Sequence, residues 1–333
     1  MYILGIESSC DETSAAIIET NGATHKILAN IVASQIDIHR LYGGVVPEIA
    51  GRAHIEAVSS ITYEALQSAG LKIEDIGAIG VTASPGLIGA LLVGVNFAKS
   101  LAYSYSIPLV AVDHVKGHTA AAYLEYPSLK PPFLSVVVSG GHTSIYEVKD
   151  PVTFDEIGAT RDDAAGEAFD KIARVIGIPY PGGAGLDKLA KNGNKKAISF
   201  PSPAIAGDNL DFSFSGLKTS ALNYINIAKQ KGEEIPREDL AASYTDTIVK
   251  AVVKKADAAL KETGAHSLVL AGGVAANSHL REGLEALCKR RHVEFCVPSL
   301  KLCSDNAAMI AMQAYWEYAD GKRADTSLNA SAV

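Results

Sequence analysis

Two histidines, His114 and His118, stand four residues apart in the stretch Val112-Asp-His-Val-Lys-Gly-His118. On a helix, positions i and i+4 share one face, so both imidazoles can approach a single ion. Neutral imidazole is a common metal ligand, and two imidazoles with one carboxylate leave open positions on the metal. No glutamate follows His114, so the general base of the H-E-x-x-H zinc peptidases is missing. Taken alone, the pair also fits ordinary core or surface histidines.

Three turns made of small residues could bind an anion. Ser8–Thr13 and Ser139–His142 each join two strand-like segments, where successive backbone N–H groups form a concavity suited to phosphate. The third turn, within Leu270–Asn277, runs through two glycines into a predicted helix, whose unpaired N–H groups and dipole favour phosphate. Each turn alone also fits an ordinary tight turn. Three of them together favour a nucleotide-binding protein.

Four aspartates occupy positions where chemistry competes with a structural role. Asp305 precedes an apolar, helix-forming stretch, so it is either a metal ligand or the helix N-cap. Asp170 and Asp187 fall on helical patterns and are surface carboxylates by default. Asp11 lies in the first small-residue turn, and turn formation explains it equally well.

The bulk numbers limit the possible partners. A chain of 333 residues exceeds what one hydrophobic core usually holds, so we expect two lobes. A net charge of −7 argues against autonomous nucleic-acid binding. An RNA partner would need a local basic patch or help from another subunit. The candidates are Lys195-Lys196 and Lys289-Arg290-Arg291, each of which also fits a solvated loop or helix end.

The expected compartment is the cytoplasm. The four cysteines form no C-x-x-C pair and suggest reduced thiols. The first residues read as a strand rather than a signal peptide. Residues 76–98 carry no charge over a length that could span a bilayer, but Ser84-Pro85-Gly86 interrupts them. We therefore expect a buried strand, a turn and a helix there, and no membrane span.

The elements that must position these residues alternate along the chain. Hydrophobic periodicity predicts strands at 2–7, 14–20, 26–34, 76–83, 109–112, 133–138, 143–148, 267–270 and 293–297. It predicts helices at 47–70, 87–105, 114–123, 165–176, 239–261, 274–290 and 306–318. Strands separated by helices imply parallel βαβ units. A hairpin followed by this alternation occurs twice, which predicts an internal duplication with lobes 1–130 and 131–333. Residues 180–218, rich in Gly, Pro, Ser and Asn, form a predicted irregular insertion, either a lid or a subdomain.

Over nearly its whole length the chain resembles the tRNA threonylcarbamoyladenosine-forming transferases, closely their bacterial-type catalytic subunit. Beside the histidine pair, the matching stretches are Gly5–Thr13, 42–50, 85–89, Val138–Thr143, Ala165–Lys171, 180–183, 212–218, 271–277 and 304–307. Small departures at Ala83-Ser84 and Ala159-Thr-Arg161 alter no proposed ligand.

The resemblance implies a duplicated α/β fold like that of actin, sugar kinases and heat-shock ATPases, with two lobes around a nucleotide cleft. It implies one metal ion per subunit, Fe²⁺ or else Zn²⁺, bound by His114, His118 and Asp305. It also implies the substrate-binding positions Val137, Val138, Ser139, Gly140, Gly141, Asp170, Gly183, Asp187 and Asn277.

The implied reaction is an acyl transfer. The exocyclic N6 amine of the adenosine 3′ of the anticodon (position 37), in tRNAs that read codons starting with A, attacks the carbonyl of threonylcarbamoyl-AMP, and AMP leaves. Such a reaction chiefly needs positioning, polarisation and exclusion of water. Asp11 is a candidate for proton removal from the amine. Implied partners are tRNA, a smaller paralogous subunit and a small ATPase, but no membrane.

Two other functions remain in view. A kinase or ATPase of the sugar-kinase type fits the same fold, but such enzymes bind Mg²⁺ through carboxylates and phosphate rather than imidazoles. A metallopeptidase fits the histidine pair but lacks the glutamate base. A non-catalytic scaffold is disfavoured because the predicted ligand set is intact.

Overall fold

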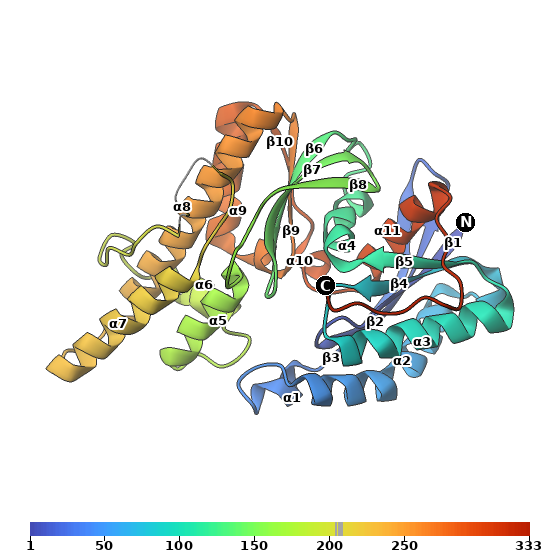
Figure 1. Ribbon diagram of the computed structural model, residues 1–333, viewed down its shortest axis with the longest axis horizontal. Coiled ribbons are helices and arrows are strands. Elements are labelled where there is room, and N and C mark those ends of the chain that lie inside the picture. Colours follow the sequence, from blue (N-terminus) through green and yellow to red (C-terminus); the bar gives the residue numbers. More distant parts are fainter. Residues whose placement is uncertain (204, 206–208) are drawn as a thin grey trace. The chain divides into compact units, whose positions relative to one another are not determined.

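The computed structural model describes residues 1–203, 205 and 209–333 (Figure 1). The chain forms two compact units. Unit 1 comprises Met1–Pro131, Lys149–Phe154 and Pro298–Val333, and unit 2 comprises Pro132–Val148 and Asp155–Val297. The last segment, which the sequence-based division places in the second lobe, thus belongs to unit 1, because its main helix packs on the first sheet.

Each unit is built on one five-stranded sheet. The strands of unit 1 are β1 (Tyr2–Glu7), β2 (Glu12–Thr20), β3 (His25–Ser34), β4 (Ile76–Ser84) and β5 (Leu109–Asp113). Those of the second sheet are β6 (Phe133–Val138), β7 (Thr143–Asp150), β8 (Thr153–Ala159), β9 (Ser267–Ala271) and β10 (Glu294–Cys296).

The two sheets have the same topology. The first runs β3-β2-β1-β4-β5, and the second, taken from its other edge, runs β8-β7-β6-β9-β10. In each, a hairpin (β1–β2 or β6–β7) pairs antiparallel, and the next two strands join in parallel. The internal duplication predicted from the sequence is therefore confirmed.

Helices follow the strands in both units. Unit 1 contains α1 (Ile36–Arg40), α2 (Pro47–Ala69), α3 (Ile88–Tyr105), α4 (His114–Ala120), α10 (Leu300–Cys303) and α11 (Ala307–Ala319). Unit 2 contains α5 (Ala165–Val175), α6 (Gly182–Ala190), α7 (Ser215–Lys231), α8 (Arg237–Thr263) and α9 (Ser278–Arg291). Short 3₁₀ turns lie at Ile73–Asp75, Ala121–Leu124 and Gly273–Ala276.

Five of these strands and helices are absent from the sequence-based prediction, namely β8, α1, α6, α7 and α10. The predicted insertion 180–218 contains all of α6 and the start of α7, so it is less irregular than expected. Its residues 204 and 206–208 lie outside the described residues. Residues 76–98 form β4, a turn and α3, as predicted. Within the described ranges, none of the helices has both the length and the apolar character needed to traverse a bilayer.

The two faces of the first sheet pack differently. Leu4 and Ile6 of β1 point into a core shared with Val58 of α2 and Val95 of α3. Successive side chains of a strand alternate between faces, so Gly5 and Glu7 lie on the opposite face.

On that opposite face, glycine lets α11 approach the sheet closely. Gly5 and Gly80 are register partners in the β1–β4 pair. A Cβ atom on Gly5 would lie 2.2 Å from the carbonyl oxygen of Ala307, and one on Gly80 would lie 2.3 Å from the Cβ of Ala314. Since both neighbours belong to α11, the position of this helix depends on the absence of those two side chains.

We predict that Gly5→Ala lowers the free energy of unfolding by about 1–3 kcal/mol, because a backbone carbonyl cannot yield as a side chain does. Gly89→Ala is the matched control, since a Cβ there has no neighbour within 4 Å. It should be neutral or stabilise α3 by about 0.5–1 kcal/mol. Urea unfolding of both variants measures the difference, and equal midpoints would contradict the close approach of α11.

Candidate metal centre

Helix α4 begins directly at the end of β5. Asp113 caps it, its carboxylate accepting a hydrogen bond from the backbone N–H of Lys116 at 3.0 Å. His114 is therefore the first helical residue, and His118 lies one turn later on the same face. Both side chains are buried, with ring centroids 4.6 Å apart. The helical placement predicted from the spacing of the pair is confirmed.

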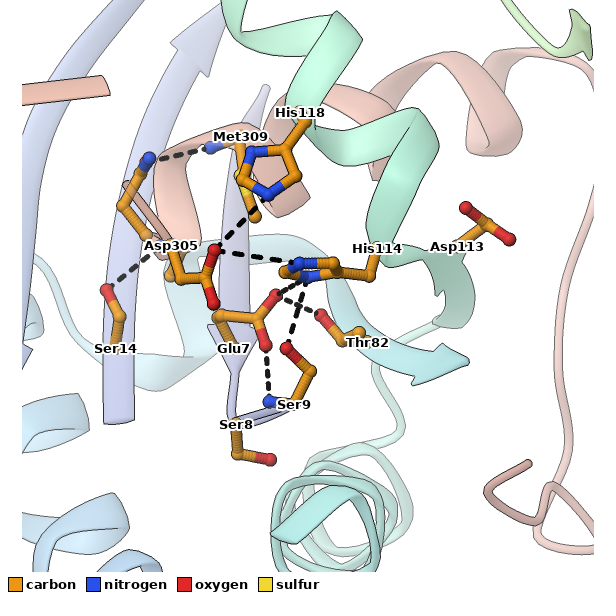
Figure 2. Close-up of polar contacts among 12 residues, drawn as sticks. Glu7, Ser8, Ser9, Ser14, Thr82, Asp113, His114, His118, Asp305 and Met309 are labelled. Atoms are coloured by element: carbon orange, nitrogen blue, oxygen red, sulfur yellow. Dashed lines mark hydrogen bonds and ion pairs between the residues drawn. The ribbon is translucent and has the colours of Figure 1, made fainter. Parts of the chain in front are cut away.

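The carboxylate of Asp305 reaches the imidazoles from the loop between α10 and α11. Its Oδ1 lies 3.6 Å from Nε2 of His114 and 3.2 Å from Nε2 of His118 (Figure 2). The N-cap of α11 is the next residue, Asn306, whose side chain accepts from the N–H of Met309 at 3.1 Å. The alternative role of Asp305 as helix cap is therefore wrong.

These three residues fit a metal ion. Their candidate ligand atoms all lie within 4.8 Å of one another. With metal–ligand bonds of about 2.0–2.2 Å, neighbouring ligand atoms stand about 3–3.5 Å apart, close to the separations from Asp305. Both ring nitrogens of His118 are buried and lack a hydrogen bond among the described residues, and Nε2 faces the carboxylate of Asp305 at 3.2 Å. A buried polar atom without a partner costs about 1–3 kcal/mol, which a bound cation at Nε2 would offset.

The carboxylate of Glu7 interacts with Nδ1 of His114, the ring nitrogen that faces away from Asp305. The sequence did not predict this role of Glu7. Its Oε2 lies 2.9 Å from Nδ1 of His114, and the hydroxyl of Thr82 donates to the same oxygen at 2.8 Å (Figure 2). The N–H of Ser9 donates to Oε1 at 2.5 Å. This carboxylate fixes the ring orientation of His114 and directs its Nε2 toward Asp305, as in carboxylate–histidine–metal arrangements. The sequence did contain a sign of this role, because Glu7 is a charged residue at the end of an otherwise apolar predicted strand.

Charge interactions alter the protonation of this pair. Burial opposes the ionisation of Glu7, but the charge and hydrogen bond of His114 outweigh it, so the pKa of Glu7 is lowered. Burial likewise opposes protonation of His114, but the carboxylates of Glu7 and Asp305 raise its pKa to about 9. The two residues therefore form an ion pair at neutral pH when no cation is bound.

Asp11 lies in the same unit, in the turn between β1 and β2, and is buried. The neighbouring Glu12 has its pKa raised to about 10, first by burial and then by the carboxylates of Asp305 and Asp11. Burial, followed by the charge of Asp11, also raises the pKa of the Cys10 thiol. The turn is anchored to α2 by His54, whose ring nitrogens lie 2.7 Å from the Thr13 hydroxyl and 3.0 Å from the Cys10 carbonyl oxygen. The surplus of carboxylates here favours a cation.

The predicted substrate positions lie in unit 2, several of them at the ends of β6 and β9. Val137 and Val138 are fully buried strand residues, so only their backbone could meet a ligand. The following turn is closed by Ser139, whose N–H donates to the carbonyl of His142 at 2.7 Å. A Cβ on Gly140 or Gly141 would meet nothing within 4 Å, so both backbones border open space.

Three other predicted positions support helix N-termini. Oδ1 of Asp170 accepts from the N–H groups of Gly182 and Gly183, at 2.8 and 2.9 Å, at the start of α6. Asp187, on α6, accepts from the N–H of Ser278 at the start of α9. Asn277 caps α9 through the N–H of Leu280 at 2.9 Å. The default expectation of solvated surface carboxylates is therefore wrong for Asp170 and Asp187, which tie α5, α6 and α9 together.

We predict that Glu7→Gln weakens metal binding by about 10–100-fold, because a neutral amide no longer stabilises the His114 ring as a ligand. Glu19→Gln, an exposed position on β2 of the same sheet, is the control and should bind metal normally. Competition titrations with a chromogenic chelator measure both affinities. Equal affinities would exclude this role of Glu7.

We predict that metal affinity rises with pH between about 7 and 9. The raised pKa of His114 means that a proton must leave before its nitrogen can bind an ion, so the affinity gains up to about tenfold per pH unit. The stability of the metal-free protein depends on pH in the opposite direction. The contribution of protonated His114 to the free energy of unfolding is lost as pH rises through about 9. Chelator titrations across this range test the first effect and thermal melts test the second. A flat affinity profile would contradict the ion pair.

The chain matches the family model described as TsaD, tRNA N6-adenosine threonylcarbamoyltransferase, over residues 26–312. A curated relative of that name in Clostridium botulinum (strain 657) is 52% identical over 328 residues. Another, in Clostridium novyi, is 52% identical over 329 residues. Each alignment covers 98% of this chain and 96% of the relative.

Solved structures support the fold class. HypF from T. kodakarensis superposes with a TM-score of 0.66 at 13% identity, covering 96% of this chain and 48% of that one. The ROK hexokinase from Thermus thermophilus gives 0.51 at 15% identity, covering 96% and 100%. Such identities show the fold alone, and they confirm the predicted actin-like, sugar-kinase-type architecture. On the match over nearly its whole length, the chain belongs to the TsaD family of tRNA N6-adenosine threonylcarbamoyltransferases.

Proposed function

We propose that this chain transfers the threonylcarbamoyl group of threonylcarbamoyl-AMP to the N6 amine of the adenosine 3′ of the anticodon, in tRNAs that read codons beginning with A. Family membership supports the reaction type. The single observation that carries the proposal is the convergence of His114, His118 and Asp305 within 4.8 Å.

The ion we propose for this site is Fe²⁺, with Zn²⁺ as the alternative. Two imidazoles and one carboxylate are the ligand set of non-haem iron(II) sites with open positions. When bound, such an ion would act as a Lewis acid on substrate oxygen atoms. Glu7 would hold one ligand ring in place, and the buried setting of His118 would exclude water from the other.

Proton removal from the attacking amine falls to a group in unit 1. Asp11 is our candidate for this role, because it is a buried carboxylate in the turn beside Glu12, whose charge interactions include Asp305. Burial and the charges of Asp305 and Asp11 raise the pKa of Glu12, which is hydrogen-bonded to Asp11, and burial raises the pKa of the Cys10 thiol. Both neighbours are therefore less suited than Asp11 to accept a proton at neutral pH. Asp11 has a carboxylate that can accept a proton, and it lies in a buried turn beside Glu12.

The adenylate would be held by unit 2. The open backbone of Gly140 and Gly141 offers N–H groups to a phosphate. The start of α9 adds a helix dipole beside Asn277, whose oxygen is engaged in capping while its amide nitrogen can donate. Asp170 and Asp187 would act indirectly, by fixing the helices that border the ligand. Gly183 would contribute through its backbone carbonyl group, since its N–H already donates to Asp170.

The two other functions fit less well. This chain shares its fold with the hexokinase, which would suit a kinase or ATPase, but a shared fold does not determine function. Kinases that depend on Mg²⁺ bind it through carboxylates and phosphate, whereas the candidate site here contains two imidazoles. A metallopeptidase needs a glutamate after the first histidine, and that position is the buried Val115.

We further propose a smaller paralogous subunit and a small ATPase as partners, and the cytoplasm as the compartment. The acidic net charge supports partners, because tRNA binding by one chain of charge −7 would be weak. The four cysteines are all free, as expected for reduced thiols.

The decisive test mixes this chain, its partner subunits, threonylcarbamoyl-AMP and tRNA, and detects threonylcarbamoyladenosine by mass spectrometry of digested tRNA. We expect product with the natural chain and none with His118→Ala, which loses a ligand. Asp11→Asn should slow turnover by about 10²-fold or more, because the base is gone. The exposed Asp37→Asn is its charge-matched control. Near-normal turnover by Asp11→Asn would remove Asp11 from the mechanism, and absence of product with the natural chain would refute the proposed function.

A further inference from the structure

Two short basic runs, far apart in the sequence, meet in one groove of unit 2. A cavity of about 750 Å³ lies along α8, α9 and the segment after α6. Lys195 of the first run and Arg290 of the second both line it, although each run alone fits a solvated loop or helix end. The other cations that line it are Lys191, Lys250 and Lys254. We call this surface the basic groove.

A second, smaller cavity continues the basic groove at the C-terminal end of α8. It measures about 210 Å³, and its cations are Lys261 and Arg291, accompanied by two histidines. Asp257, which lines the first cavity, pairs with both of these cations, so the two cavities adjoin. Lys250, Lys254 and Lys261 follow one another at helical spacing along one face of α8.

The ion pairs inside the groove leave an excess of positive charge. Asp257 serves Lys261, Arg290 and Arg291, with N···O distances of 3.1, 3.5 and 2.7 Å. Asp246 serves Lys195 and Lys250, at 3.8 and 2.6 Å. Two carboxylates thus hold five cations in place. Because these side chains are already ordered, they would lose less conformational entropy when a ligand binds.

This local charge contrasts with that of the whole chain. Seven lysines and arginines but only three acidic residues line the two cavities, whereas the chain contains 30 lysines and arginines and 37 acidic residues. An extended row of cations, five of them held by ion pairs, on an acidic protein matches a regular polyanion. We propose that the basic groove binds the phosphate backbone of the substrate tRNA.

This inference rests on the proposed function, because the identification of tRNA as the polyanion comes from the reaction of the family. Arginine and lysine along a groove neutralise phosphates without reading sequence, so the contacts would orient the tRNA rather than select it. An acidic segment of a protein partner is the competing occupant.

The test uses Lys191→Ala/Lys254→Ala in the assembled complex. Neither lysine pairs with an acidic residue among the described positions, so the substitutions leave no carboxylate uncompensated. Lys229→Ala/Lys231→Ala is the matched control, because both lysines are exposed in the last turn of α7, in the same unit and outside the groove. KM for tRNA, kcat and the salt dependence of tRNA binding are measured for each, with thermal melts to verify folding.

We expect the groove variant to raise KM for tRNA about tenfold with kcat unchanged, and to reduce the slope of log affinity against log salt by about 2. The control should change KM by about twofold or less. Equal changes in both doubles would overturn the inference. So would competition by poly-glutamate as strong as that by unmodified RNA of equal charge, because the groove would then accept an acidic polypeptide. Loss of the proposed function looks different, since the natural complex would then yield no threonylcarbamoyladenosine while still binding tRNA through the groove.

Discussion

The close contact between α11 and the first sheet is the constraint on which the metal centre depends. The imidazoles follow β5, whereas Asp305 comes from near the other end of the chain. Gly5 and Gly80 bring α11 against β1 and β4, and the N–H of Ala307 donates to the hydroxyl of Ser14 on β2 at 2.9 Å. These contacts fix the start of α11, and with it the loop that carries Asp305. The same face of β1 bears Glu7, so one sheet face positions both the ligands and their support.

Much of the architecture could be predicted because it is local. The 3.6-residue and two-residue hydrophobic periods place α2, α3, α8 and most strands within a few residues of their observed bounds. The amphipathic pattern of α7 was also present in Leu217, Ala221 and Ile225, but the surrounding glycines, prolines and serines hid it. The duplication followed from the order of elements rather than from similarity of residues.

The site was less predictable, because residue type does not reveal a partner far along the chain. Asp305 and Asn306 are adjacent and both suit a helix N-cap, so only the structure shows which one caps and which one faces the imidazoles. Glu7 sits in an apolar strand, and its role depends on His114 and Thr82. Asp170 and Asp187 have the chemistry of catalytic groups, yet they accept backbone hydrogen bonds at the starts of helices. In this chain, the carboxylates of Asp170 and Asp187 therefore have a structural role, although their residue type suggested a catalytic one.

The discontinuous make-up of unit 1 has a consequence for biosynthesis. Its first 131 residues leave the ribosome early, but Pro298–Val333 are made only after unit 2. Until then the glycine-lined face of β1 and β4 has no covering helix, and the two imidazoles have no carboxylate opposite them. Unit 2, whose residues emerge in between, can complete its own core during translation. An ion supplied to the nascent protein would therefore find its third ligand, Asp305, only after the whole of unit 2 has been made.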